Sequence, residues 1–532
     1  IVIGGGASGC AVTSKLLDNN KKVCLFEAGY SHHNFLLDVP AGFFKVINNS
    51  SKYATYHKTN PQKHLGGRQN IIPQGNVLGG GTSINAQVYM RGRAEDYNEW
   101  QEILRGNNDS EGWSWNDVLP YFKEMENNNR IDDQYHGTTG RLNVTDSSCV
   151  NELSHDFVKT VHRLGIPLTD DFNGKEQKGV GLYQFMNSKG KRSSAAYAFI
   201  EPHKKNPNLN LKLQSKVEKI IIENNKAIGV EYKNKYGQIS QYFANKEVLI
   251  TSGSFITPKL LMLSGIGNQQ ELSRLGIDCL IDLPGVGENL IDHPECPLIA
   301  KTNGKYGYYK QGQGWRMIKN GLQFLLFGSG PVNSTGVEAG AFINPINHDD
   351  LAYIQAFFVP SIYMNSDTIG VIKDDYGMSI TTVMTKPKSR GSVKLKSKDP
   401  NDMPIIELNL LKHKDDLEMM MRGQKFFLRV LQEGELGAKV KEIIIPSIKD
   451  LDDYKLAEHC KKFVRTNYHP SGTAKMGADN DKMAVLDSKL RVRGIANLRV
   501  CDLSAMPNIN SGNTSAPAMM LGLRCGDIIL SS

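Results

Sequence analysis

A histidine near the C-terminus, His469, stands in a setting suited to proton transfer. It precedes Pro470 in a loop with Ser471 and Gly472, rather than lying on an apolar helix face. The unperturbed pKa of imidazole is about 6.5, so this side chain can accept a proton at neutral pH. One histidine among thirteen is more often structural, but this context makes His469 a candidate general base.

A glycine-rich turn at the start of the chain is suited to a dinucleotide. Gly4, Gly6 and Gly9 follow the apolar run 1–3 and open a helical pattern, and Glu27 ends the next apolar run, 23–26. Glycines let the backbone approach a pyrophosphate, and the helix N-terminus supplies aligned N–H groups. An acidic residue about 20 positions on can bond the ribose hydroxyls. A plain glycine turn is the alternative, and the pattern leaves FAD and NAD both open.

The elements that must position these residues follow an α/β pattern. Parallel-type apolar runs lie near both chain ends, a β-meander is predicted between 209 and 250, and strand-like runs and a helix fill the middle at 339–343, 353–359, 379–384, 392–395 and 415–431. We expect a Rossmann-like domain of parallel sheet plus β-meander, with an inserted domain of antiparallel sheet and helices. The predicted boundaries are 1–145, 190–294 and 463–532 for the first domain, and 146–189 and 295–462 for the second.

Composition argues against several classes of partner. The net charge of +8 arises from 63 basic and 55 acidic residues, and the lysines are scattered. Without a basic stripe interleaved with aromatics, no nucleic-acid binding is expected. No stretch reaches the roughly 20 apolar residues of a membrane span. The longest apolar runs, such as 322–327, have the length of core segments.

Eight dispersed cysteines without CxxC or zinc spacing indicate reduced, structural thiols and no metal site. This favours a soluble, intracellular chain, although the location is otherwise unknown. Because the first residue already lies inside a predicted strand, we expect the N-terminus to be incomplete. The sequence says nothing about oligomeric state.

Two longer segments resemble the signatures of the glucose–methanol–choline (GMC) oxidoreductases. The segment 75–85, with Gly79-Gly80-Gly81 at its centre, resembles the first signature, and 253–267 resembles the second. Family-like phrases recur at 112–115, 171–174, 283–290 and 389–391. The resemblance covers nearly the whole chain. It implies FAD-dependent oxidation of a CH–OH donor to an aldehyde or ketone.

The cofactor contacts combine the glycine turn with this resemblance. Consecutive glycines let the backbone lie against a flat ring or a phosphate, although tight packing is the alternative. The expected FAD-binding residues are Gly4, Gly6, Gly9, Glu27, Gly79, Gly80, Thr82, Asn85, Val217, Asp502, Asn513 and Thr514. Some family members carry a histidine that bonds covalently to the flavin. The matching position here is Ile84, whose alkyl side chain cannot form that bond, so non-covalent FAD is predicted.

The resemblance also assigns a catalytic pair. Residues 467–477 are similar to the catalytic stretch of the family, in which the histidine, here His469, is the base. Asn513 matches the second active-site position, although an Asn after Gly is also a common turn residue. The helix that follows it would stabilise negative charge on the flavin. The expected reaction sends the hydroxyl proton to His469, the hydride to flavin N5, and the electrons on to molecular oxygen or another acceptor.

Aromatic residues suggest the substrate class. Tyr468, Phe357 and Phe358 are expected to line the pocket, which favours a primary aryl or other apolar alcohol as the small-molecule substrate, unless they are ordinary core. A hydroxynitrile lyase and a light-driven decarboxylase of the same fold are alternatives. A third is a structural or surface flavoprotein with little activity, because the Asn-, Lys- and Ile-rich composition resembles giant-virus members, for which a place in the virion would follow. Oxidase and dehydrogenase activity are both left open.

Overall fold

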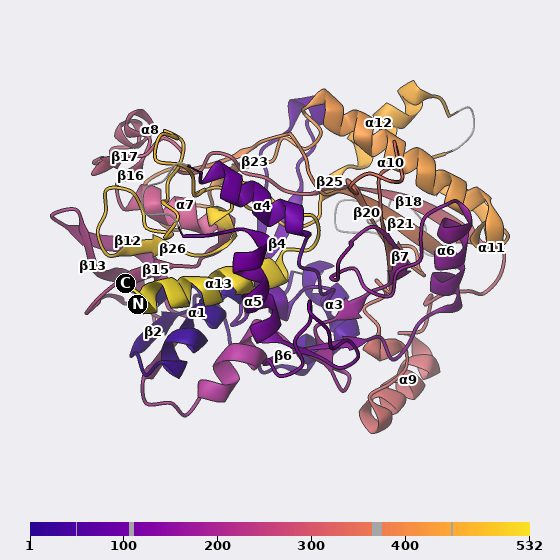
Figure 1. Ribbon diagram of the computed structural model, residues 1–532, viewed down its shortest axis with the longest axis horizontal. Coiled ribbons are helices and arrows are strands. Elements are labelled where there is room, and N and C mark those ends of the chain that lie inside the picture. The colour runs from indigo at the N-terminus through magenta and orange to yellow at the C-terminus, as the bar shows by residue number, and fades with distance from the viewer. Residues whose placement is uncertain (49, 106–110, 364–374, 448–450) are drawn as a thin grey trace.

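Five short parallel strands from widely separated parts of the chain form one sheet (Figure 1). The computed structural model describes residues 1–48, 50–105, 111–363, 375–447 and 451–532. The strand order is β11 (Leu209–Lys212), β2 (Val23–Phe26), β1 (Val2–Ile3), β15 (Val248–Ile250) and β26 (Leu498–Val500). β1, β2, β15 and β26 are buried along their whole length, as expected for a parallel sheet covered on both faces.

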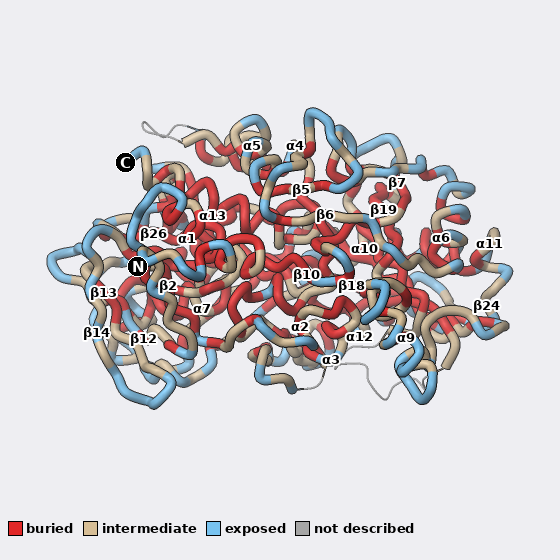
Figure 2. Tube along the Cα trace, turned by 90° about the horizontal axis from the view of Figure 1, so that it is seen from below, coloured by how far each residue is buried: buried red, intermediate tan, exposed pale blue. Residues whose placement is uncertain are grey.

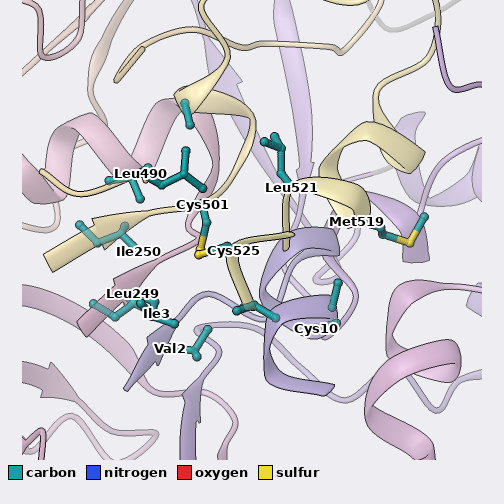
Figure 3. Close-up of a cluster of buried hydrophobic side chains, with 14 of the residues drawn as sticks. Val2, Ile3, Cys10, Leu249, Ile250, Leu490, Cys501, Met519, Leu521 and Cys525 are labelled. Atoms are coloured by element: carbon teal, nitrogen blue, oxygen red, sulfur yellow. The ribbon is translucent and has the colours of Figure 1, made fainter. Parts of the chain in front are cut away.

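The helices α1 (Ala7–Asp18) and α13 (Ser515–Leu530) pack against each other beside this sheet. Figure 3 shows side chains of β1, β15, α1 and α13 meeting in one apolar cluster. Gly522 permits the approach of the two helices, because a Cβ at this position would lie 2.3 Å from the carbonyl oxygen of Ser8. A meander of β12 (Lys216–Glu223), β13 (Lys226–Lys233) and β14 (Ile239–Phe243) completes this half of the fold.

A second, antiparallel sheet is built mainly from the middle of the chain. Its order is β24 (Val440–Ile445), β18 (Pro294–Thr302), β21 (Gly377–Met384), β20 (Ile354–Val359), β19 (Ala339–Ile343) and β7 (Gly179–Leu182). The short β25 (Arg465–Thr466) also pairs with β18. Three helices pack on this sheet: α6 (Glu152–Arg163), α10 (Lys414–Gln432) and α12 (Asp453–Phe463). Their apolar side chains form a second core, and both cores lie inside a shell of exposed loops (Figure 2).

The remaining helices and strands surround these two sheets. The helices are α2 (Phe35–Asp38), α3 (Phe43–Asn48), α4 (Ala94–Ile103), α5 (Trp115–Met125), α7 (Gly253–Leu263), α8 (Gln269–Arg274), α9 (Gly314–Phe327) and α11 (Gly434–Gly437). The strands pair as β3 (Ala54–Lys58) with β4 (Ile71–Gly75), β5 (Glu126–Asn128) with β6 (Leu142–Asp146) and β8 (Gln184–Phe185), β9 (Asn187–Ser188) with β10 (Lys191–Arg192), β16 (Ile266–Gly267) with β17 (Ile281–Asp282), and β22 (Ser392–Lys394) with β23 (Ile405–Glu407).

The predicted fold class is confirmed: a Rossmann-like parallel sheet with a meander, and an antiparallel sheet covered by helices. The strands predicted at 239–243 and 339–343 coincide with β14 and β19. The domain boundaries stay a prediction. In the described part of the chain, no helix combines the length and the apolar character that crossing a membrane requires.

Candidate active site

A cavity of about 600 Å³ extends from the parallel sheet to the antiparallel sheet. At one end its walls come from the turn after β1 and the end of β2, including Gly4, Gly6, Ala7, Ser8 and Glu27. At the other end they include Phe357, Val359, Thr381, His469 and Asn513. The two groups of residues that the sequence marked for chemistry therefore share one cavity.

The dinucleotide end has the donors that a pyrophosphate requires. Gly6 is the N-cap of α1, the first turn of α1 contains no acidic residue, and no side chain caps its N-terminal amides. Glu27 lines the same wall, and its carboxylate oxygens accept hydrogen bonds from the amides of Gly5 (2.8 Å) and Gly29 (2.7 Å). Burial raises the pKa of Glu27, and these two amides oppose the shift. A carboxylate has about four acceptor positions, so ribose hydroxyls could still be bound here.

The glycine-rich segment after β4 forms the adjoining wall. Gly80, Thr82 and Asn85 line the cavity, and a Cβ on Gly80 would lie 2.9 Å from the Cα of Gly6. A Cβ on Gly81 would meet nothing within 4 Å. The two glycine turns thus lie against each other and leave an open backbone cradle, which fits a flat or phosphate-bearing group.

Two of the predicted cofactor residues have a different place. Gly9 and Gly79 are not among the residues that line the cavity, and their contact with the cofactor stays a prediction. A Cβ on Gly9 would lie 1.9 Å from the Gly4 carbonyl oxygen, so this glycine lets α1 pack against the turn that precedes it. Gly79 adopts φ 89° and donates its N–H to the Gly5 carbonyl at 2.7 Å. Both glycines therefore allow the close backbone packing that supports the two glycine turns.

The helices α7 and α13 point their N-termini at the cavity from other sides. Thr514 is the N-cap of α13, and no side chain caps this helix. Thr514 and Val217, which the sequence predicts to bind FAD, both line the cavity. Asp502 also lines it, but its Oδ2 accepts from the Gly253 amide (2.9 Å) and the Thr257 hydroxyl (2.7 Å) at the start of α7. Its Oδ1 accepts from the Ser504 amide at 2.8 Å. Asp502 therefore ties α7 to the loop after β26.

His469 is held beside a second buried histidine, His293. Their Nδ1 atoms are 3.0 Å apart, and Nε2 of His293 is 3.0 Å from the backbone oxygen of Asn510. A backbone carbonyl only accepts, so His293 carries its proton on Nε2 and accepts at Nδ1. His469 then donates from Nδ1, and its Nε2 keeps a lone pair. The amide nitrogen of Asn467, 3.4 Å from Nδ1 of His469, is too far to compete.

Asn513 presents its amide nitrogen to the same place. Nδ2 of Asn513 lies 3.5 Å from Nε2 of His469, and both residues line the cavity. Gln355 on β20 donates its Nε2 to Oδ1 of Asn513 at 3.2 Å. This bond turns the donor end of Asn513 toward the histidine. A hydroxyl oxygen placed between them could give its proton to His469 and accept from Asn513.

Burial keeps both imidazoles neutral. Loss of solvent lowers the pKa of His469 well below its ordinary value, and His293 lowers it further. Burial lowers the pKa of His293 to about 4. Burial also raises the pKa of Asp292 to about 7, although the hydrogen bond from the Thr466 hydroxyl lowers it. Oδ1 of Asp292 accepts from the His469 backbone amide at 3.0 Å. At neutral pH His469 is therefore in its base form.

The substrate end agrees with the sequence at two of three predicted positions. Phe357 and Tyr468 line the cavity. The prediction for Phe358 is wrong, because successive side chains of a strand point to opposite faces. Phe358 is fully buried in the core under α6, where its ring stacks on that of Phe157 at 4.9 Å.

Glu295 places a carboxylate on the cavity wall, and Arg465 pairs with it. Nε of Arg465 donates to Oε1 of Glu295, and both side chains are almost completely buried. Burial raises the pKa of Glu295, whereas the guanidinium of Arg465 lowers it. The pair leaves this wall without net charge.

Sequence reasoning missed His293, Gln355, Glu295 and Arg465. The sequence does contain a signal for His293, because His293-Pro294 repeats the His-Pro dipeptide of the catalytic loop and begins three positions after the family-like phrase 283–290 ends. Gln355 is a lone polar residue in a buried strand, and nothing in the sequence shows what it faces.

Comparison with known proteins identifies the family. Residues 1–295 and 387–522 match GMC oxidoreductases. The chain is 36% identical to an alcohol dehydrogenase (acceptor) of Pseudomonas putida and 35% identical to an oxygen-dependent choline dehydrogenase of Sinorhizobium fredii, in each case over 100% of this chain and 95% of the relative. A formate oxidase of Aspergillus oryzae superposes with a TM-score of 0.90 at 26% identity, over 100% of this chain and 97% of the other. The chain therefore belongs to the GMC oxidoreductase family.

Proposed function

We propose that this chain oxidises a neutral, largely apolar primary alcohol to the aldehyde, with non-covalently bound FAD and with His469 as the general base. One observation carries the proposal. The neutral imidazole of His469 and the amide donor of Asn513 face one cavity, and the same cavity continues to the glycine turns that fit a dinucleotide. Family membership and relatives named as alcohol and choline dehydrogenases support the same reaction type.

The residues around the cavity fit FAD. The uncapped N-terminus of α1, the Glu27 carboxylate and the cradle at Gly80 and Gly81 match the pyrophosphate, ribose and ring of a dinucleotide. When bound, FAD supplies the two-electron acceptor for the hydride of the alcohol carbon. Ile84 lines the cavity with a side chain that cannot bond to a flavin, which supports a dissociable cofactor.

The protein groups divide the proton chemistry between them. Nε2 of His469 accepts the hydroxyl proton, and His293 holds the required tautomer by accepting from Nδ1. Asn513 donates to the substrate oxygen and so keeps it beside the base. The N-terminus of α13 adds partial positive charge at the same end of the cavity, where it stabilises negative charge.

The walls favour a neutral substrate. Phe357, Val359 and Tyr468 supply apolar surface, and Arg465 compensates the carboxylate of Glu295 on the same wall. Among the described residues of this wall, a cationic alcohol such as choline would find no uncompensated charge. Neutral aryl or alkyl alcohols therefore fit this cavity better than choline does.

The test is anaerobic mixing of the FAD-bound protein with neutral primary alcohols and with choline, following flavin absorbance. We expect neutral alcohols to bleach the flavin, with kcat/KM higher than for choline. His469→Ala should retain FAD but lose about 10²–10⁴ in the rate of bleaching, because general-base assistance is removed. His155→Ala, at an exposed position of α6, is the matched control and should bleach as the wild type does.

Near-normal bleaching by His469→Ala would remove the assigned base. Bleaching by no alcohol at all would instead favour a lyase or a structural flavoprotein. Admitting air afterwards separates an oxidase, which recovers its colour, from a dehydrogenase that needs another acceptor.

A further inference from the structure

The helix α9 exposes apolar side chains that a core segment would bury. The run 322–327 has the length and composition of core, yet most of its large side chains face outward, and Figure 1 shows α9 at the periphery of the molecule. The exposed fractions are 67% for Trp315, 62% for Ile318, 54% for Leu322, 68% for Leu325, 71% for Leu326 and 75% for Phe327.

Five of these residues form one continuous stripe. Positions 315, 318, 322, 325 and 326 follow the spacing of a single helix face. The side toward the protein is occupied by Phe324 and Asn320, which are buried. Nδ2 of Asn320 donates to the backbone oxygen of Gln311 at 3.0 Å. The helix is therefore fastened by one face and presents a second, wholly apolar face to its surroundings.

The surrounding sequence is basic. Between residues 296 and 337 there is no Asp or Glu. Arg316 and Lys319 lie on α9 itself, and Lys305 and Lys310 are exposed before it, whereas Lys301 on β18 is 3.9 Å from the carboxylate of Asp375. Nζ of Lys319 lies 5.9 Å from the centre of the Trp315 ring, beside the apolar stripe. An apolar face with a tryptophan, edged by cations and free of acids, is typical of helices that lie in the interface of an anionic membrane.

We propose that α9 binds the surface of an anionic lipid bilayer, with its axis in the membrane plane and its stripe inserted among the headgroups and upper acyl chains. The 14 residues of α9 rise about 21 Å, less than the roughly 30 Å of a bilayer core, so α9 rests on the membrane. Trp315 occupies the interface that tryptophan prefers, and the basic residues contact lipid phosphates.

A second copy of this chain is a poorer partner for the same face. In a two-fold dimer α9 would face α9, which brings Arg316 and Lys319 of one copy close to the same residues of the other. Like charges placed opposite each other oppose association. An anionic bilayer offers the complementary charge and the apolar depth together.

The position of α9 connects the membrane to the cavity. The short helix η6 (Pro331–Asn333) follows α9 and packs against η1 (Pro40–Gly42), and beyond them Phe43, Ile47 and Val337 line the cavity. An apolar alcohol dissolved in the bilayer could therefore enter the cavity past these apolar residues. This consequence rests on the proposed function, whereas membrane binding by α9 does not.

The test uses FAD-bound protein with vesicles of mixed phosphatidylglycerol and phosphatidylcholine, and with vesicles of phosphatidylcholine alone. We expect flotation with the anionic vesicles, weakened by salt and at least tenfold weaker in the triple variant Leu322→Gln, Leu325→Gln, Leu326→Gln. Trp315 should shift its fluorescence to the blue and be quenched by brominated lipid. Trp315→Phe should lose this signal, because Trp100 and Trp113 are buried and the partly buried Trp115 packs against the core beside the parallel sheet. The matched control, Tyr236→Gln, Ile239→Gln, Phe243→Gln, removes equally exposed apolar groups at the meander and should bind normally.

Absence of binding by the wild type, or full binding by the leucine variant, would overturn the proposal. A wild-type dimer that the leucine variant converts to monomer, without vesicle binding by either, would assign the stripe to a second copy. Bleaching of the flavin by a water-soluble alcohol in the absence of lipid should be the same in all these variants. A failure of the proposed reaction is thereby distinguished from a failure of membrane binding.

Discussion

The protonation state of His469 depends on its neighbours more than on its own ordinary pKa. Burial disfavours the imidazolium, and the contact with His293 directs the proton of the neutral ring to Nδ1. The lone pair at Nε2 is therefore ready before any substrate arrives. This arrangement uses one histidine as the base and a second as its orienting partner, which is a positioning role.

The pH dependence of alcohol oxidation should reflect this burial. The base form is active, so a lowered pKa moves the acid limb of kcat/KM to lower pH. We expect kcat/KM to stay flat from about pH 8 to about pH 6, whereas an unperturbed histidine would already lose activity around its pKa of about 6.5. Flavin-reduction rates measured across this range check the prediction, and an acid limb centred at or above pH 6.5 would contradict it.

Replacing the orienting histidine should weaken the base without removing it. In His293→Phe the N–H at Nδ1 of His469 loses its acceptor in a buried site, a cost of about 1–3 kcal/mol. This corresponds to a loss of about 5- to 150-fold in kcat/KM, smaller than that of His469→Ala. His293→Asn, whose side-chain oxygen can accept, should recover part of the rate and of the wild-type pH profile. Equal losses of kcat/KM in both variants, with an unchanged pH profile, would show that His293 only packs against its neighbours and does not orient His469.

At the scale of elements, pairing of β25 with β18 explains how two distant histidines meet. Pro294 pairs with Thr466 and Glu295 with Arg465 in antiparallel register. The Asn467 amide then donates to the His293 carbonyl at 2.9 Å, so the ladder ends where the two His-Pro segments lie side by side. The same register places the Glu295–Arg465 pair on the substrate wall.

The strand β20 offers a matched pair of aromatic substitutions. Phe357 faces the cavity and Phe358 faces the core, so truncation should affect different properties. Phe357→Ala should lower kcat/KM for an aryl alcohol by about tenfold or more, since an apolar pocket contact is lost. Phe358→Ala should lower the free energy of unfolding by about 3–5 kcal/mol and leave kcat/KM per bound flavin unchanged. Chemical denaturation and steady-state kinetics on both variants test this prediction. Reversed effects would show that the two faces of β20 are wrongly assigned.

At the scale of the whole molecule, the cofactor site is assembled from segments scattered over the entire chain. The turns after β1 and β4, the end of β2, and the N-termini of α7 and α13 all meet at one cavity. Bound FAD would therefore link these segments.

The resemblance to giant-virus members stays a prediction.

FAD should be released intact on unfolding and should stabilise the fold. A ligand that binds only the native state adds about 2.7 kcal/mol at 100 times its Kd, so thermal unfolding should shift upward with added FAD. Acid precipitation should leave the flavin in the supernatant, because Ile84 cannot bond to it. Flavin that stays with the precipitated chain would contradict non-covalent binding.

The sequence by itself determined what is local or long and position-specific. The strand, glycine turn and helix at 1–18, the Glu27 that answers them, the β-meander and the His469 loop could all be predicted, because they depend on short-range patterns of glycine, apolar residues and turns. The tertiary structure alone decided which distant side chains meet. His293 beside His469, Gln355 beside Asn513, Phe358 in the core and the exposed stripe of α9 follow from strand register and from which helix face packs. Register and packing depend on contacts between residues far apart in the chain, and no local pattern contains that information.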